Sequence, residues 1–176
     1  MQIKIGQSIV ELVQGDITQE DTEAIANAAN SGLRGGGGVD GAIHKAAGPS
    51  LMQELRRRYN SCPTGSAVIT TGGKLKATYV LHAVGPVYRG GENDAKLLAG
   101  AYYTCLKLCT DNHIKSVAFP SISTGIYGYP VEEASRIALK TIIDYLREHP
   151  EIELVKMVLF SERDYTIYKS ALEEIL

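Results

Sequence analysis

Apolar and polar residues alternate near the start of the chain, and this period of two is typical of half-buried β-strands. Gly6 and Gln7 interrupt the alternation, so it predicts two strands joined by a tight turn. Farther along, short apolar runs bounded by turn residues predict buried strands. Together the expected strands cover residues 2–5, 8–14, 25–29, 67–71, 79–84, 116–120 and 154–160.

Between these strands, apolar residues recur at the spacing of amphipathic helices. Ser161, with Asp164 three residues later, resembles a capping box that opens a C-terminal helix. Strands that alternate with helices predict a mostly parallel sheet covered by helices on both faces. The expected helices cover residues 39–47, Pro49 or Ser50 to about Arg58, residues 94–112, Val131 to near Pro150, and the segment after Ser161 up to Ile175.

Two glycine-rich segments each follow an expected strand and precede an expected helix. The first contains four consecutive glycines, Gly35 to Gly38, and the second runs from Pro120 to Pro130. Such loops expose backbone N–H groups, and a loop that enters a helix N-terminus is a typical phosphate site. Both loops would fall at the carboxyl ends of the strands, where ligands bind. The pair predicts a diphosphate held from two sides; Arg34, the only cation in either loop, would either favour it or be solvated.

Composition and charge narrow the classes of function. The chain has 176 residues and a formal net charge of −2, which fits one globular domain and provides no basic stripe for nucleic acid. No apolar run approaches the ~20 residues of a membrane span, and the N-terminus has no signal-peptide pattern. The three cysteines and four histidines show no metal-ligand spacing. We expect a cytoplasmic protein with reduced thiols, two of them packed (Cys105 and Cys109), and with no metal, cofactor or membrane partner.

Other nucleotide and hydrolase motifs are absent or incomplete. Residues 36–41 match the G-x-G-x-x-G pattern, but no strand-terminal acid follows about twenty residues later, as dinucleotide binding requires. There is no Walker-type loop, and Ser121 and Ser123 do not fit the elbow of serine hydrolases. Hydride transfer, ATP hydrolysis and serine-based hydrolysis are therefore not supported.

Four segments taken together closely resemble the macrodomain family: residues 15–18, 27–30, 35–41 and 123–128. Residues 42–49 and the pair Phe119-Pro120 are similar to its MacroD-type branch. The resemblance covers essentially the whole chain, so we treat residues 1–176 as a single macrodomain. It implies a three-layer α/β/α sandwich around a mixed, mostly parallel sheet that binds ADP-ribose. It also implies hydrolysis of ADP-ribosyl esters, namely mono-ADP-ribosylated Asp or Glu side chains of proteins and O-acetyl-ADP-ribose.

The resemblance also implies a set of ADP-ribose-binding residues. Asp16 would accept a hydrogen bond from the adenine amino group, although Asp commonly caps the segment that follows it. Phe160 would lie against the adenine, although a phenylalanine at a strand end is also compatible with a simple core position. The diphosphate and the distal ribose would be bound by the two loops. The complete set is Asp16, Ile17, Asn27, Gly37, Gly38, Val39, Ser123, Thr124, Gly125, Ile126, Tyr127 and Phe160.

The expected catalytic residues are Asp40, Asn30, His44 and Tyr127. Asp40 would polarise a water molecule near the distal ribose with help from a substrate phosphate; its alternative role is to stabilise the helix dipole. Asn30 would bind a ribose hydroxyl or satisfy a turn. His44 shares a helix face with Asp40, so it would orient that carboxylate or pack in the core. Tyr127 would close over the distal ribose or be a plain exposed aromatic.

Three alternative functions stay open from the sequence. The first is a module that binds ADP-ribose without turnover, and the presence of both Asn30 and Asp40 argues against it. The second is a binder of RNA or poly(ADP-ribose) chains, which the acidic balance disfavours. The third is a phosphatase acting on ADP-ribose 1″-phosphate in the same pocket.

Overall fold

The computed structural model describes residues 1–176, which form one seven-stranded sheet and five α-helices. The strands are β1 (Gln2–Ile5), β2 (Ser8–Gln14), β3 (Ala24–Ala28), β4 (Ser66–Thr71), β5 (Tyr79–Val84), β6 (Ser116–Phe119) and β7 (Leu154–Leu159). The helices are α1 (Gly38–Ala47), α2 (Ser50–Arg58), α3 (Glu92–Asp111), α4 (Val131–Glu148) and α5 (Glu162–Ile175), with a short 3-10 helix, η1, at Ile17–Gln19.

The sheet is mixed and mostly parallel, as predicted. Its order is β1-β2-β7-β6-β3-β5-β4. The inner pairs β2–β7, β7–β6, β6–β3 and β3–β5 are parallel, and the outer pairs β1–β2 and β5–β4 are antiparallel. The carboxyl ends of the parallel strands therefore meet at one edge of the sheet, where the loops that follow β3 and β6 lie close together.

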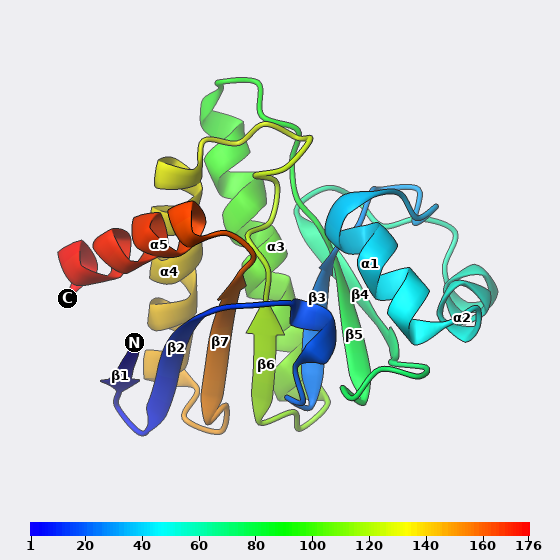
Figure 1. Cartoon of the computed structure of the whole chain (residues 1–176), viewed down its shortest axis with the longest axis horizontal. Helices are drawn as coiled ribbons and strands as arrows, with labels where there is room; N and C mark the ends of the chain where they lie inside the picture. Colours follow the sequence, from blue (N-terminus) through cyan, green and yellow to red (C-terminus); the bar gives the residue numbers. More distant parts are fainter.

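Helices cover both faces of the sheet, which confirms the expected three layers. Helices α3, α4 and α5 pack on one face and share a core cluster of 34 buried residues with the strands. Helices α1 and α2 pack on the other face through two smaller clusters. Because strand side chains alternate, Ala24 and Ala26 face the large cluster and Ile25 faces α1. In Figure 1, α4 and α5 lie beside β2 and β7, and α1 and α2 lie towards the opposite end of the sheet.

The expected elements differ from the observed ones mainly at their ends. The strand expected over residues 25–29 is Ala24–Ala28, and Pro120 and Phe160 lie just beyond β6 and β7. Helix α3 begins at Glu92 rather than at Asp94, since the Asp94 carboxylate accepts hydrogen bonds from the N–H groups of residues 89–91 ahead of the helix. All three cysteines are buried, so Cys62 joins the two that were expected to be packed. None of the helices is both long enough and apolar enough to cross a membrane.

Candidate functional site

A cavity of about 380 Å³ opens at the carboxyl ends of β3 and β6, between the two glycine-rich loops. It brings together nine residues that the sequence analysis named, which are Asn30, Gly37, Gly38, Val39, Asp40, Ser123, Gly125, Ile126 and Tyr127. Six further residues complete its lining: Ala28, Ala29, Gly36, Gly85, Ser121 and Ile122. In Figure 1 the start of α1 and the chain that follows β6 both lie over this edge of the sheet.

The first loop delivers the start of α1 to the cavity. Gly37 is the N-cap of α1 and no side chain caps the helix, so the N–H groups of its first turn are left without intrahelical partners. Gly38 has φ of 57°, a left-handed conformation that favours glycine. These amides and the positive end of the helix dipole make the loop a site for an anion.

Asp40 lies in the first turn of α1 with only 6% of its surface exposed. One carboxylate oxygen, Oδ1, accepts a hydrogen bond from Asn27 Nδ2 at 2.8 Å and lies 3.3 Å from His44 Nε2. The other oxygen, Oδ2, has no hydrogen-bond partner in the protein, and it lies 3.6 Å from where a Cβ on Gly36 would be. The carboxylate is therefore held through one oxygen, while the other remains free beside the first loop.

The contact between His44 and Asp40 follows from their positions four residues apart on one helix. His44 does not line the cavity, so its position supports the orienting role that the sequence analysis considered for it. Asn27 does not line the cavity either: it is fully buried on β3 and contacts Asp40 from beneath.

Asn30 fixes the shape of the chain that leads into the first loop. Its Oδ1 accepts a hydrogen bond from the Arg34 N–H at 3.0 Å, and its Nδ2 donates to the Gly35 carbonyl at 2.9 Å. The turn-satisfying role is thus present in the structure. One amide hydrogen and one lone pair remain for a ligand, because Asn offers two donors and two acceptor sites.

Buried tyrosines support the second loop from below. Tyr102 of α3 accepts a hydrogen bond from the Ile122 N–H at 3.0 Å and donates to the Pro120 carbonyl at 3.2 Å. Tyr168 of α5 lies 2.7 Å from Ser121 Oγ. Burial raises the pKa of Tyr168 to about 12, so its hydroxyl stays neutral at physiological pH.

Ser123 combines two unusual features at the cavity wall. Its φ of 68° is uncommon for a residue other than glycine, and its Oγ is buried without a hydrogen-bond partner. Thr124, expected to bind ADP-ribose, does not line the cavity, and its hydroxyl donates to Ser121, within reach of both the carbonyl and the hydroxyl oxygen. Ile126 is completely exposed at the mouth of the cavity.

Asp16, Ile17 and Phe160 lie outside the cavity lining, at the ends of β2 and β7. The Gly15 N–H donates to the Leu159 carbonyl, which keeps the two chain segments side by side. Asp16 caps η1 through its Oδ1, which accepts hydrogen bonds from the N–H and the hydroxyl of Thr18. Phe160 is 84% exposed, so the core position considered for it is wrong.

A second, more open cavity of about 630 Å³ adjoins the first one. Asn30 lines both cavities, and Arg34 lines only the second one. The cation therefore does not line the cavity that contains the start of α1.

Known proteins are similar to this chain over almost its whole length. The Macro domain family matches residues 26–138. The O-acetyl-ADP-ribose deacetylase of Salmonella newport is 49% identical over 171 residues, which cover 95% of this chain and 96% of the relative. The chain belongs to the macrodomain family.

Solved structures of other macrodomains have the same fold. The Oceanobacillus iheyensis macrodomain with ADP has a TM-score of 0.95 and 48% identity, over 99% of this chain and 95% of that one. The Trypanosoma brucei macrodomain in complex with ADP-ribose has a TM-score of 0.87 and 41% identity, over 93% of this chain and 68% of that one. The family and fold expected from the sequence are confirmed.

Some residues around the site of this macrodomain were not found by sequence reasoning. Gly85 is one of them: a Cβ there would lie 2.2 Å from Ser123 Oγ and 2.6 Å from Ile122 Cγ2, so the second loop requires glycine at this position. In the sequence, the Gly85-Pro86 pair indicates only a turn after the strand expected over residues 79–84. Ala28 ends β3 and Ala29 follows it. Both belong to the segment 27–30 that carries the family resemblance, but their methyl side chains indicate no individual role at the site.

Proposed function

We propose that this macrodomain binds ADP-ribose and hydrolyses its esters, removing mono-ADP-ribose from Asp and Glu side chains of proteins and deacetylating O-acetyl-ADP-ribose. The observation that carries the proposal is the Asp40 carboxylate, which is held through Oδ1 and has Oδ2 free beside an uncapped helix N-terminus. A module that only binds the nucleotide needs the helix start but not a tethered carboxylate. A carboxylate close to a bound phosphate is electrostatically unfavourable, so its presence there suggests a chemical role.

The diphosphate and distal ribose fit the 380 Å³ cavity. The free amides at the start of α1 are donors for phosphate oxygens, and Ser123 Oγ is a buried hydroxyl with no partner in the protein. The Oceanobacillus iheyensis macrodomain, which has the same fold, is described with ADP, and the Trypanosoma brucei one with ADP-ribose. These parallels favour the same ligand class here.

The adenine fits at the ends of β2 and β7. Asp16 uses Oδ1 to cap η1, which leaves Oδ2 for an adenine amino group, and the exposed Phe160 ring offers a flat apolar surface. Strands β7 and β6 separate β2 from β3, so at about 4.8 Å per strand the two regions lie about 14 Å apart. An extended dinucleotide-like ligand spans such a separation.

In the proposed reaction, Asp40 Oδ2 orients and polarises a water molecule, with a substrate phosphate assisting. The water oxygen forms a bond to the ester carbonyl carbon, or to C1″ of the distal ribose when the ester oxygen is attached there, and the bond between the attacked carbon and the ester oxygen breaks. One water proton passes to the departing oxygen, which gives ADP-ribose and a free carboxylic acid in either case. General-base help of this kind typically contributes about 10²–10⁴-fold to the rate.

The second cavity supports a substrate larger than an acetyl ester. It begins at Asn30, next to the proposed position of the distal ribose, and its lining includes Arg34 and two serines, Ser31 and Ser61. A peptide chain that carries the modified Asp or Glu would leave the first cavity in this direction. Arg34 would favour acidic residues near the modified side chain.

The test is hydrolysis of two substrates in H₂¹⁸O: O-acetyl-ADP-ribose and an acidic peptide mono-ADP-ribosylated on glutamate. We expect turnover of both, and the position of the label identifies the attacked atom. Arg34→Glu should slow hydrolysis of the peptide substrate several-fold and leave the acetyl ester unchanged, while the control Arg89→Glu should affect neither. ADP-ribose binding without any turnover would contradict the proposal and leave a reader module. Release of phosphate from ADP-ribose 1″-phosphate alone would favour the phosphatase.

A further inference from the structure

A row of buried polar side chains crosses the sheet beneath Asp40. Asn27 on β3, His82 on β5 and Thr70 on β4 are each at most 1% exposed. The strand register pairs Asn27 directly with His82. Asn27 Nδ2 lies 3.2 Å from His82 Nδ1, and His82 Nε2 lies 2.9 Å from Thr70 Oγ1. The row therefore links the Asp40 carboxylate, through Asn27, to β4 at the edge of the sheet.

The direction of every hydrogen bond in this row follows from the charge of Asp40. The Asn27 atom 2.8 Å from Asp40 Oδ1 must be the NH₂ group, because an amide oxygen would repel the carboxylate. The same NH₂ group donates to His82 Nδ1, which must then be unprotonated. The proton of His82 is therefore on Nε2, and it is donated to Thr70 Oγ1. The Thr70 hydroxyl in turn donates to the Thr71 carbonyl at 3.0 Å.

We propose that His82 and Thr70 are positioning residues for Asp40: they fix the orientation of the Asn27 amide, which in turn holds the Asp40 carboxylate with Oδ2 free. This inference rests on the proposed function of Asp40. Neither residue lines the cavity, so neither would touch the substrate. Their contribution would pass entirely through Asn27.

Two observations indicate that the row serves Asp40 and not only the packing of the sheet. Asn27 Oδ1 is buried and has no hydrogen-bond partner. The NH₂ group of the same amide has two partners, Asp40 and His82. A buried polar atom without a partner is costly, and such an orientation needs contacts that enforce it. Burial and the nearby His44 lower the pKa of His82 to about 3, which keeps the ring neutral and its Nδ1 an acceptor. A protonated ring would turn an N–H towards the Asn27 amide and oppose the observed orientation.

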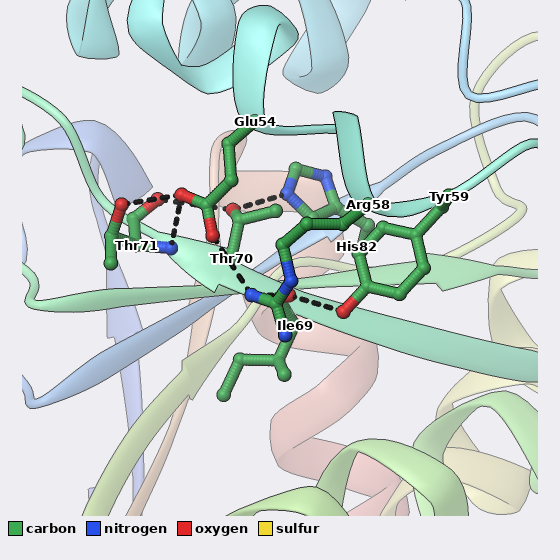
Figure 2. A network of polar contacts seen from close by, with 7 residues as sticks. All are labelled: Glu54, Arg58, Tyr59, Ile69, Thr70, Thr71 and His82. Atoms are coloured by element: carbon green, nitrogen blue, oxygen red, sulfur yellow. Dashed lines mark hydrogen bonds and ion pairs between the residues drawn. The ribbon is translucent and has the colours of Figure 1, made fainter. Parts of the chain in front are cut away.

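The next residue of β4, Thr71, provides a matched control. Its N–H and hydroxyl donate to Glu54 of α2, and Arg58 also donates to that carboxylate. Figure 2 shows the two neighbouring threonines in different contacts, Thr70 with His82 and Thr71 with Glu54. A change at Thr71 therefore disturbs the anchoring of β4 to α2 but leaves the row to Asp40 intact.

The experiment compares Thr70→Val, Thr70→Ser and Thr71→Val in steady-state hydrolysis of O-acetyl-ADP-ribose. Thr70→Val leaves the His82 Nε2–H without an acceptor, so we expect kcat to fall roughly 3–10-fold with KM within about twofold. The acid limb of the kcat pH profile should move upward, because a weaker Asn27 bond disfavours the charged form of Asp40. Thr70→Ser should restore both kcat and the position of the acid limb. Thr71→Val should keep the wild-type kcat even if its free energy of unfolding is lower.

Nuclear magnetic resonance of the free protein separates this inference from the proposed function. The ¹⁵N shifts of His82 should identify a neutral ring protonated at Nε2. These signals need no substrate, so they test the row even if the wild-type protein hydrolyses nothing. A ring protonated at Nδ1, an unchanged kcat in Thr70→Val, or an equal kcat loss in Thr71→Val would overturn the inference.

Discussion

The two glycine-rich loops of this macrodomain occupy equivalent positions, after a strand and before a helix, but they are supported in different ways. Polar side chains surround the first loop: Asn30 bonds to its start, and the ionisable pair Asp40 and His44 follows it on α1. The second loop rests on the neutral hydroxyls of two buried tyrosines, Tyr102 and Tyr168. It presents Ile126 to solvent.

This difference suggests a division of work between the loops. Charge and directed hydrogen bonds near the first loop can act on a reacting bond, because electrostatic interactions strengthen away from water. The second loop is held by uncharged hydroxyl groups and exposes an apolar side chain, so it is suited to forming the wall of a binding site and to covering a bound ligand. We therefore expect changes at the second loop to affect mainly binding and changes around Asp40 to affect mainly turnover.

The largest expected effect on the second loop comes from Tyr102→Phe. The change leaves the buried Ile122 N–H without its partner, which should lower the free energy of unfolding by about 1–3 kcal/mol. ADP-ribose affinity should fall severalfold while kcat changes little. Tyr103→Phe, on the half-exposed neighbour in the same helix, is the control and should change neither. A drop in kcat with intact affinity would contradict the binding role of the second loop.

At the first loop, Gly41→Ala sets two effects against each other. Replacing glycine by alanine within a helix normally stabilises it by about 1 kcal/mol. Here the new Cβ would lie 2.6 Å from the Gly36 carbonyl oxygen, and overpacking against backbone costs about 1–3 kcal/mol. We expect net destabilisation of up to about 2 kcal/mol in urea unfolding, together with lower turnover as the loop shifts. Gly37→Ala meets no atom within 4 Å and should leave stability unchanged. A more stable Gly41→Ala protein would contradict this packing.

Acid sensitivity should reveal the buried His82. Its pKa is lowered from 6.5 to about 3 by burial, so below pH 6.5 the unfolded chain binds a proton that the folded chain does not. The neutral ring therefore contributes fully to the free energy of unfolding above pH 6.5. This contribution is lost as pH falls from 6.5 towards 3, by at most about 1.4 kcal/mol per pH unit. Unfolding free energies measured from pH 7 to pH 4 should therefore fall less steeply for His82→Gln than for wild type. Parallel slopes would mean that His82 titrates normally.

The smallest expected effect concerns the exposed side chain at the mouth of the cavity. Ile126→Ala removes part of the apolar surface of this side chain. If ADP-ribose covers Ile126, the variant should bind ADP-ribose more weakly by about 1 kcal/mol, or roughly fivefold. Stability should not change, since the side chain is fully exposed in the free protein. Val87 is also exposed but lies outside the cavity lining, so Val87→Ala is the control and should bind ADP-ribose as wild type does in calorimetry. Equal affinities for Ile126→Ala and wild type would remove the covering role.

Much of this fold was predictable because apolar periodicity records which face of each element is buried. The helix over residues 39–47 and the strand over residues 79–84 illustrate this, each observed within one residue of its predicted bounds. The glycine loops were likewise predictable. Four consecutive glycines cost conformational entropy on folding, so their presence indicates a backbone that a ligand approaches closely. The family resemblance provided the individual roles at the site, and the cavity lining includes Asp40 and Asn30 but excludes Thr124 and Phe160.

The support beneath Asp40 was not predictable from one sequence. His82 and Thr70 stand inside apolar strands, so each was an available signal of a polar group that needs a buried partner. Their partners, however, depend on the register between strands that are far apart in the chain. Spacing along one sequence does not encode that register.

We propose that Asp40 performs chemistry and does not merely stabilise a helix start. The Asp40→Asn variant separates these two roles, because the amide keeps the size of the side chain and an oxygen that can still accept from Asn27. Single-turnover hydrolysis of O-acetyl-ADP-ribose and calorimetry with ADP-ribose should be measured on both proteins. We predict turnover about 10²-fold lower in the variant with ADP-ribose affinity kept or improved. Turnover close to that of wild type, with binding intact, would contradict the claim.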